Sequence, residues 1–353
     1  MYRKFSISFL CLFLALLLGC GALVYVIDPM FHYHAPWTSL PPVTTDERHQ
    51  VGGIAENFDY DSILIGTSVT ANFRASWFDE AFSCKTAKFT FPGGNFGEFI
   101  KALDMAYEDH EIQRVFWGLD ANLLTAFPQE STELLPDYLY NDNPWDDVEY
   151  LYNKDVLFRQ IVSMLYAFRW DPVPTVDDLF AWENRYEWGP QAVMKVYGRP
   201  EPTPMMGSDI FSAETSANLQ IILPYVQAHP ETEFYFFIPP YSIVFWDRVY
   251  RRGTLEGTLS AQEAALQALA QCDNVHVYYP CAEEEVICDL EQYTDPIHYS
   301  PKVNQWITEK MASSSGLTPQ EIPQAVEEMR QLAWNYPYEE LFALHPPQLP
   351  PET

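Results

Sequence analysis

The chain has 353 residues, of which 48% are hydrophobic and 16% aromatic. This composition is too apolar for a disordered chain and is enough for one large or two modest folded domains. The net charge of −29, from 49 acidic and 20 basic residues, disfavours nucleic acid as a partner because such a surface repels phosphate backbones.

The chain begins with a long apolar run. After Arg3 and Lys4, residues 5–27 carry no charge, and about 20 apolar residues are what a bilayer-spanning helix needs. Because basic residues stay on the cytoplasmic side, we expect residues 1–28 to be a membrane anchor and the rest of the chain to be extracytoplasmic. The acidic surface repels anionic lipids, so attachment would come from apolar insertion. Two processed forms remain open, a cleaved signal peptide and a lipoprotein attached through Cys20.

Residues 29–57 form a connector rich in proline and aromatic residues, which we expect to lie along the domain. His32 and His34 sit at alternate positions in it and could form a metal pair, but packing against aromatic neighbours is the favoured interpretation, and no metal is predicted. Cys281 and Cys288 are close enough in sequence to form a disulfide in an oxidising compartment. Buried free thiols are the equally open alternative.

From residue 58 to residue 312, short apolar runs alternate with amphipathic segments. Apolar runs of this kind are typical of strands covered on both faces, and the alternation predicts an α/β fold with a parallel sheet of about five strands and helices on both faces. The expected strands are 62–65, 86–91, 114–117, 233–238 and 274–279. The expected helices are 95–107, 213–227, 260–271 and 301–312. Pro224 is expected to kink the second of these helices or to end it early.

Two segments depart from this alternation. Residues 121–212 are rich in tryptophan, tyrosine and acidic residues, and we expect a helical insertion at the carboxyl edge of the sheet. Whether the insertion is a structural cap or a platform for substrate or partner remains open, because groove aromatics and core aromatics look alike in sequence. Residues 313–353 predict one amphipathic helix, 319–334, followed by a disordered Pro-rich tail.

The first predicted strand runs into Gly66-Thr67-Ser68. Open α/β sheets place their reactive groups at this carboxyl edge, where a serine at the end of a rigid strand would present its hydroxyl to solvent. Ser68 is therefore the candidate nucleophile. The structural alternative is an ordinary strand-to-helix turn in which a hydroxyl caps the helix.

Asp295 and His298 come just before the last helix of the alternating region, which Ser300 and Pro301 are suited to open. They follow the final strand, so they belong to the same sheet edge as Ser68. The carboxylate would orient the imidazole, and the imidazole would take the serine proton. A helix-entry loop capped by Asp295 is the structural alternative.

Together, the strand-Gly-x-Ser block and the late Asp-x-x-His block resemble the SGNH (GDSL-like) hydrolase superfamily, which has a flavodoxin-like sheet. The resemblance covers about residues 61–311, interrupted by the insertion. It implies that the backbone N–H groups of Ser68 and Gly94 bind the oxyanion that forms during acyl transfer.

Gly118-Leu119-Asp120 stands where the superfamily often has Gly-x-Asn, and an ionised aspartate has no hydrogen to donate. Asn95 or Asn122 would then supply the third donor, or the two backbone N–H groups serve alone. Asp120 could instead bind a cationic or polyhydroxyl group of the substrate.

The anchor, Gly-Leu-Asp and the Pro-Pro-Tyr-Ser block ending in Tyr241 and Ser242 resemble a membrane-anchored branch with DltD-type and AlgJ/AlgX-type cell-surface O-acyltransferases. That resemblance implies a cofactor-free serine acyltransferase or esterase, with an acyl donor, a cell-surface glycopolymer and a membrane-bound O-acyltransferase as partners. Tyr241 and Ser242 would contact substrate, or they would only form a rigid loop. A non-catalytic scaffold that binds polymer or recruits a membrane acyltransferase is the alternative function.

Overall fold

The computed structural model describes residues 2–37, 40–170 and 175–350, which form two compact units. The first unit comprises the chain up to Asp59 together with Ile100–Asp109 and Thr132–Phe180. The second comprises Tyr60–Phe99, His110–Ser131 and the chain from Ala181 onward. The predicted insertion is thus divided between the units. The domain boundaries expected from the sequence stay predictions.

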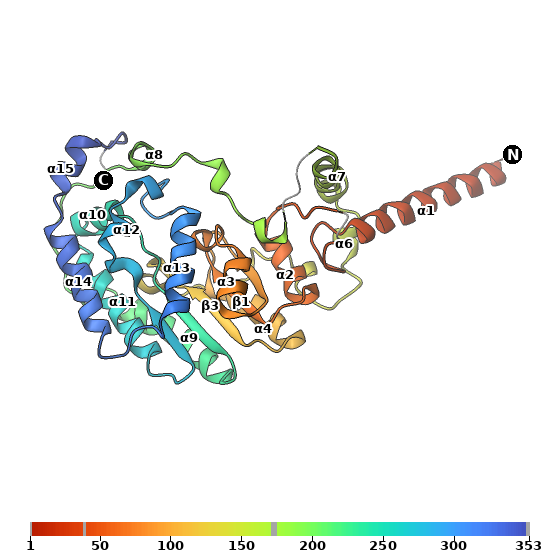
Figure 1. Ribbon diagram of the computed structural model, residues 1–353. Coiled ribbons are helices and arrows are strands. Elements are labelled where there is room, and N and C mark those ends of the chain that lie inside the picture. Colours follow the sequence, from red (N-terminus) through yellow and green to blue (C-terminus); the bar gives the residue numbers. More distant parts are fainter. Residues whose placement is uncertain (1, 38–39, 171–174, 351–353) are drawn as a thin grey trace. The chain divides into compact units, whose positions relative to one another are not determined.

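The second unit is built on a parallel sheet. Within the described residues five strands form it in the order β2-β1-β3-β4-β5, with every neighbouring pair parallel (Figure 1). The strands are β1 (Ser62–Gly66), β2 (Thr86–Thr90), β3 (Arg114–Gly118), β4 (Glu233–Phe237) and β5 (Val275–Tyr278). The predicted fold class is confirmed. Strand order reverses between β1 and β3, and such a switch point is where open sheets bind their ligands.

Helices cover both faces of the sheet because neighbouring residues of a strand point to opposite sides. Phe116 of β3 contacts Phe78 of α3 (Ala75–Phe82), with 4.5 Å between ring centroids. The next residue, Trp117, faces the other side and contacts Phe99 of α4 (Phe96–Asp109) at 5.9 Å. Helix α13 (Pro301–Ser313) lies beside α3 (Figure 1). Helix α9 (Ser212–Ala228) packs against α11 (Leu255–Leu269).

These four helices, α4, α9, α11 and α13, correspond to the four predicted from the sequence. Of the two effects expected of Pro224, an early end is wrong, because α9 continues to Ala228, and the kink stays a prediction. Pro224 is exposed, so water can satisfy the carbonyl group that loses its partner to the proline.

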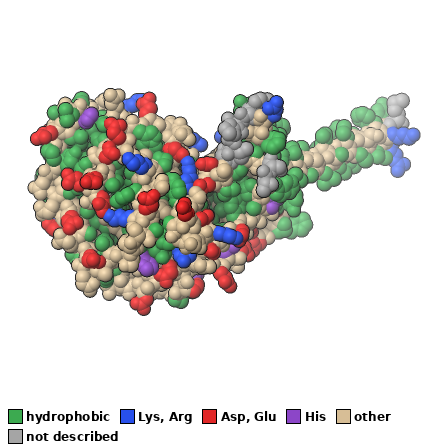
Figure 2. Space-filling view, viewed as in Figure 1, with side chains coloured by type: hydrophobic (Ala, Val, Ile, Leu, Met, Phe, Trp, Pro, Cys, Tyr) green, Lys and Arg blue, Asp and Glu red, His purple; other side chains and the backbone are tan. Residues whose placement is uncertain are grey.

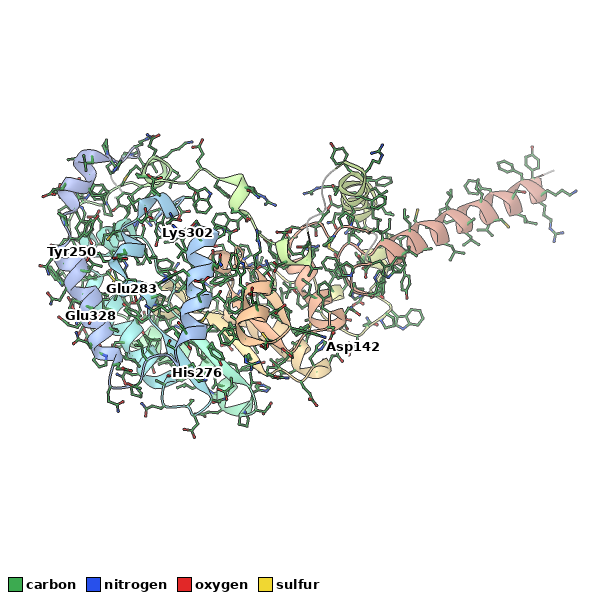
Figure 3. The ribbon with its side chains drawn as sticks, viewed as in Figure 1. Asp142, Tyr250, His276, Glu283, Lys302 and Glu328 are labelled. Carbon is green, nitrogen blue, oxygen red and sulfur yellow. The ribbon has the colours of Figure 1, made fainter. Side chains whose placement is uncertain are left out.

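The chain after residue 313 is more ordered than expected. Helix α14 (Ile322–Asn335) fits the predicted amphipathic helix, but α15 (Tyr338–Leu344) was not predicted. It is held by Phe342, which stacks on Tyr197 with 5.8 Å between centroids, and by Tyr338, whose ring centroid lies 6.2 Å from that of Tyr250. Tyr250 is labelled in Figure 3. Residues 345–350 contain no helix or strand, and the end of the predicted tail, 351–353, lies outside the described residues.

The remaining helices of the described chain are α1 (Tyr2–Ile27), α2 (Glu47–Asn57), α5 (Asn122–Thr125), α6 (Val148–Leu151), α7 (Ile161–Trp170), α8 (Pro190–Val196), α10 (Ile243–Arg251) and α12 (Glu284–Ile287). Short helical turns occur at η1 (Ser68–Thr70), η2 (Asp137–Leu139), η3 (Val156–Gln160), η4 (Val176–Asp178), η5 (Glu183–Arg185), η6 (Pro280–Ala282) and η7 (Leu290–Gln292).

The predicted apolar helix at the N-terminus is present as α1. It has 26 residues and a mean hydropathy of 2.7 in its most apolar window, so it is long and apolar enough to cross a membrane or to act as a signal sequence. Hydrophobic side chains cover most of its surface (Figure 2). Its last turns differ, because Gly21, Val24 and Ile27 are buried in the first unit.

The described cysteines are all free thiols, so Cys281 and Cys288 do not form the disulfide that the sequence left open. Cys281 is fully buried, with its sulfur 3.3 Å from the carbonyl oxygen of Pro239, and burial raises the pKa of its thiol. It therefore behaves as a small hydrophobic residue.

Candidate functional site

The structure brings Ser68, His298 and Asp295 together in series. Ser68 Oγ lies 2.7 Å from His298 Nε2, and His298 Nδ1 lies 2.6 Å from Asp295 Oδ2. The three side chains come from the turn after β1 and the loop before α13, 230 residues apart in the chain. The His298 and Asp295 side chains are 22% and 27% exposed, so a substrate can reach them. This is the geometry of a hydroxyl activated by an imidazole that a carboxylate orients.

Glycines at the strand ends let the Ser68 turn fold tightly over the sheet. A Cβ on Gly66 would lie 2.6 Å from Thr70 Cγ2, and one on Gly118 would lie 2.9 Å from the same atom. Thr70 therefore fills the space above β1 and β3 only because both strands end in glycine. The turn is η1, and Ser68 is its first residue, so its N–H has no acceptor within the turn.

A short hairpin holds Asp295 and His298. Tyr293 and Tyr299 pair as an antiparallel bridge at its base. Asp295 Oδ1 accepts from the backbone N–H groups of Ile297 at 2.8 Å and His298 at 2.9 Å. Burial by itself raises the pKa of Asp295, but the hydrogen bond and charge of His298 and these two N–H groups outweigh it and lower that pKa. Asp295 therefore stays ionised and fixes the imidazole.

Ser242 supports this hairpin from the loop after β4. Its Oγ and its backbone N–H both donate to the carbonyl oxygen of Pro296, at 2.8 and 3.0 Å. The side chain is fully buried, so it does not face a substrate. A second hydrogen bond joins the hairpin to this loop: the Tyr293 hydroxyl donates to the carbonyl oxygen of Pro240 at 2.7 Å. Ser242 is thus placed to position the Asp295–His298 loop.

Asp120 is held away from the solvent by two hydroxyl groups. Thr67 donates to one carboxylate oxygen and Tyr241 to the other. Burial raises the pKa of Asp120, and these two hydrogen bonds oppose the rise. Asp120 is 7% exposed and Tyr241 is 3% exposed. The pair therefore connects the residue before Ser68 to the loop after β4, and neither side chain is open to a substrate group.

The other predicted oxyanion donors already have partners. The backbone N–H of Gly94 donates to the carbonyl oxygen of Phe91 at 2.7 Å. Asn95 caps α4, because its Oδ1 accepts from the Gly97 N–H at 2.8 Å while its Nδ2 donates to Glu98 at 3.1 Å. Asn122 is exposed at the first position of α5. Among the predicted backbone donors, Ser68 alone presents an N–H with no acceptor in the described chain.

Trp182 lies at the candidate site, although no specific role was predicted for it from the sequence. Its indole N–H donates to the carbonyl oxygen of Ser68 at 3.1 Å, and its ring stands edge-on to His298 with centroids 5.3 Å apart. Trp188 stacks on Trp182 with ring centroids 5.8 Å apart, and Tyr186 contacts Trp182 edge-on at 5.4 Å. The aromatic richness of residues 121–212 was the only signal for this contact, since Trp182 lies 114 residues from Ser68.

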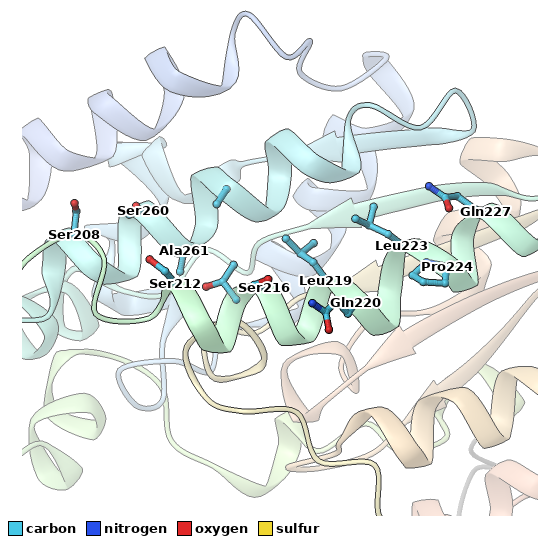
Figure 4. Close-up of a pocket in the computed structure, with 12 residues that line it drawn as sticks. Ser208, Ser212, Ser216, Leu219, Gln220, Leu223, Pro224, Gln227, Ser260 and Ala261 are labelled. Atoms are coloured by element: carbon cyan, nitrogen blue, oxygen red, sulfur yellow. The ribbon is translucent and has the colours of Figure 1, made fainter.

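The surface also carries a groove elsewhere. A cavity of about 540 Å³ lies between α9 and α11 and is lined by leucine, serine and glutamine side chains (Figure 4). None of its lining residues is a predicted site residue. Within the described residues, no cluster of three or more His, Cys, Asp or Glu side chains is arranged to hold a metal ion, and this includes His32 and His34.

Comparison with known proteins adds little. No family model matches the chain, and no curated protein matches its sequence. Among solved structures, the chain is similar to one described as "The structure of a putative platelet activating factor from Streptococcus pneumonia". The two share 12% sequence identity, and the match covers 75% of this chain and 88% of the other with a TM-score of 0.38. A similarity at this level says nothing about function. The proposed function therefore rests on the geometry of the site.

Proposed function

We propose that the protein is a membrane-anchored, extracytoplasmic serine acyltransferase or esterase that acts on acyl esters of a cell-surface polysaccharide or a teichoic-acid-like polymer. The observation that supports the chemistry is the continuous contact Ser68–His298–Asp295 at 2.7 and 2.6 Å. The acyl donor, the glycopolymer and a membrane-bound O-acyltransferase are the partners of this proposal. It requires no cofactor.

The first half-reaction forms an acyl-enzyme. Ser68 Oγ attacks the carbonyl carbon of the acyl ester while its proton passes to His298 Nε2. The bond to the leaving alcohol breaks, and the protonated imidazole returns the proton to that alcohol. Asp295 stays ionised and stabilises the imidazolium in between.

The second half-reaction repeats these steps with a different alcohol. His298 takes a proton from a sugar hydroxyl or from water, and the resulting oxygen attacks the carbonyl carbon of the acyl-enzyme. The bond from that carbon to Ser68 Oγ breaks, and the protonated imidazole returns the proton to Ser68 Oγ. A sugar hydroxyl gives transfer, and water gives hydrolysis. Trp182, Tyr186 and Trp188 offer flat apolar surface beside His298 on which a sugar ring of the acceptor could lie.

The binding site for the oxyanion is incomplete. Ser68 N–H is available to it, whereas the N–H of Gly94 would first have to leave the carbonyl oxygen of Phe91. Loss of one oxyanion donor costs a factor of about 10²–10³ in rate. We therefore expect slow turnover unless substrate binding rearranges the Gly94 turn.

A fluorophosphonate probe tests the nucleophile directly. The full chain in detergent should be labelled, Ser68→Ala should not be labelled, and His298→Ala should react at least about 10²-fold more slowly, as expected for loss of a general base. Ser208→Ala, which removes an exposed serine outside the site, is the matched control and should react like the wild type. Labelling of folded Ser68→Ala would remove Ser68 from the mechanism.

The engaged Gly94 and Asp120 favour a second candidate, a non-catalytic scaffold that binds polymer or recruits a membrane acyltransferase. This candidate predicts that Ser68→Ala and His298→Ala both restore function in a deletion strain. Loss of function in both variants, with folding unchanged by circular dichroism, would exclude it.

A further inference from the structure

The first unit carries a large group of exposed apolar and aromatic side chains, here called the apolar patch. Trp145 is 87% exposed, Phe158 77%, Tyr166 58% and Phe168 57%. The full patch is Trp145, Val148, Tyr152, Phe158, Val162, Leu165, Tyr166 and Phe168. Hydrophobic side chains gather where α1 meets the rest of this unit (Figure 2). A contiguous patch of this kind marks a surface that meets another apolar phase or partner.

Helix α7 shows that the patch is not the outer surface of an ordinary soluble helix. Ile161, Met164 and Ala167 form its buried stripe. Val162, Leu165 and Tyr166, at helical spacing on another side, are exposed. A surface helix of a soluble domain carries mostly polar side chains there, whereas this side of α7 carries three apolar or aromatic residues and one basic residue, Arg169, in its last turn.

Part of the patch lies at the base of α1. Helix α1 contacts α6 and η3 within this unit. At this contact Gly21 lies so close to Tyr152 that an added Cβ would be 3.2 Å from the Tyr152 hydroxyl oxygen. Because Tyr152 is part of the patch, this part of the patch lies where α1 leaves the unit. The same contacts bury Val24 and Ile27, so removal of α1 would expose the core beneath them.

We propose that the apolar patch rests on the lipid bilayer, with η3 and α7 lying in the membrane interface next to the point where α1 emerges. Tryptophan and tyrosine are enriched at this level of membrane proteins, and an interfacial helix is held by its buried apolar area. Since the net charge is −29, apolar insertion and not attraction to anionic head groups provides the binding. The inference rests on the proposed membrane anchor and is independent of the serine chemistry.

Site-directed fluorescence tests the proposal with the full chain. Single cysteines replace Val162 or Leu165 in a background where Cys11, Cys20, Cys272 and Cys288 are serine, and each carries an NBD label. The protein is reconstituted into vesicles of phosphatidylcholine and phosphatidylglycerol at 4:1, with and without doxyl-labelled lipid. Ser163→Cys is the matched control, because Ser163 is an exposed neighbour that lines a polar cavity with Asp155 and Arg159. Leu12→Cys reports the position of α1.

We expect doxyl lipid to quench labels at positions 162 and 165 at least about threefold more than the label at 163, with strong quenching at 12. Quenching at 12 without any at 162 or 165 would overturn the proposal while the anchor stands. Absence of quenching at all positions would overturn both. Labels at 162 and 165 that are shielded from an aqueous quencher yet insensitive to doxyl lipid would mean that a second copy or a membrane protein covers the patch, which also overturns it.

Discussion

Asp120 is buried and positions the residues around it. Its carboxylate accepts hydrogen bonds from Thr67, next to the candidate nucleophile, and from Tyr241 on the loop after β4. A carboxylate can accept from both hydroxyls at once, whereas an asparagine offers one acceptor oxygen and an amide that must donate. The aspartate therefore ties the Ser68 turn to the β4 loop but leaves the oxyanion without a side-chain donor.

This arrangement predicts a pH-dependent cost in stability. Burial raises the pKa of Asp120, so the folded protein keeps a proton that the unfolded chain releases above the ordinary aspartate value of 3.8. Stability contributed by Asp120 is thus lost as pH rises from that value through the folded pKa. We measure the free energy of unfolding of the wild type and of Asp120→Asn by urea unfolding in detergent. The value for the wild type minus the value for the variant should decrease between pH 4 and pH 7.5.

Asp295 provides the control of opposite sign. Its folded pKa is lowered, so its contribution is present above the ordinary value and lost as pH falls through the folded pKa. The stability of wild type minus that of Asp295→Asn should therefore increase with pH below about 4 and be constant above it. A pH-independent difference for Asp120→Asn would contradict the burial argument.

At the scale of elements, the strands were predictable because each is a short apolar run, as β1 and β3 show, and both end at a glycine. The proximity of Ser68 and His298 was predictable because parallel strands bring their carboxyl ends to one edge, which places both residues there without any contact information. Trp182 and α15 were not predictable. Each is fixed by partners far away in the sequence, the Ser68 carbonyl and the Tyr197 ring, and local pattern does not encode such pairings.

The contact of Ser242 with the Asp295–His298 loop also joins residues far apart in the sequence, and we expect it to hold that loop in place. Ser242→Ala removes the Oγ hydrogen bond to Pro296 but keeps the backbone one, so the loss of stability should be about 1 kcal/mol. Because the loop sets the position of His298, fluorophosphonate labelling should slow by about tenfold, which corresponds to 1.4 kcal/mol in the barrier.

Ser313→Ala is the matched control for this prediction. It also removes a serine hydrogen bond to a backbone carbonyl, that of Lys310, but at the exposed end of α13. Labelling of this variant should match the wild type. An unchanged labelling rate in Ser242→Ala, with the expected loss of stability, would show that Ser242 holds the fold without positioning the imidazole.

At the scale of the whole molecule, acidic residues exceed basic ones by 29, and the few buried ion pairs, such as Arg199 with Asp247 at 3.0 Å, cannot balance this excess. Self-repulsion of a highly charged surface destabilises the compact state. Salt screens repulsion over distances beyond about 10 Å at 0.1 M and about 3 Å at 1 M. It also weakens exposed ion pairs, but their median contribution is at most about 1 kcal/mol each. Relief of repulsion should therefore dominate.

We expect the thermal unfolding midpoint of the detergent-solubilised chain, measured at a fixed scan rate, to rise by about 1–2 °C between 20 and 500 mM NaCl, which corresponds to about 1 kcal/mol for a chain of 353 residues. Chloride is the appropriate anion because sulfate stabilises proteins by exclusion from their surface whatever their charge. The rise should shrink as pH is lowered toward the isoelectric point of about 4.4, where the repulsion disappears. A midpoint that falls with salt at pH 7.5, or a rise that is the same at pH 5, would show that specific ion pairs and not the net charge govern the stability of this molecule.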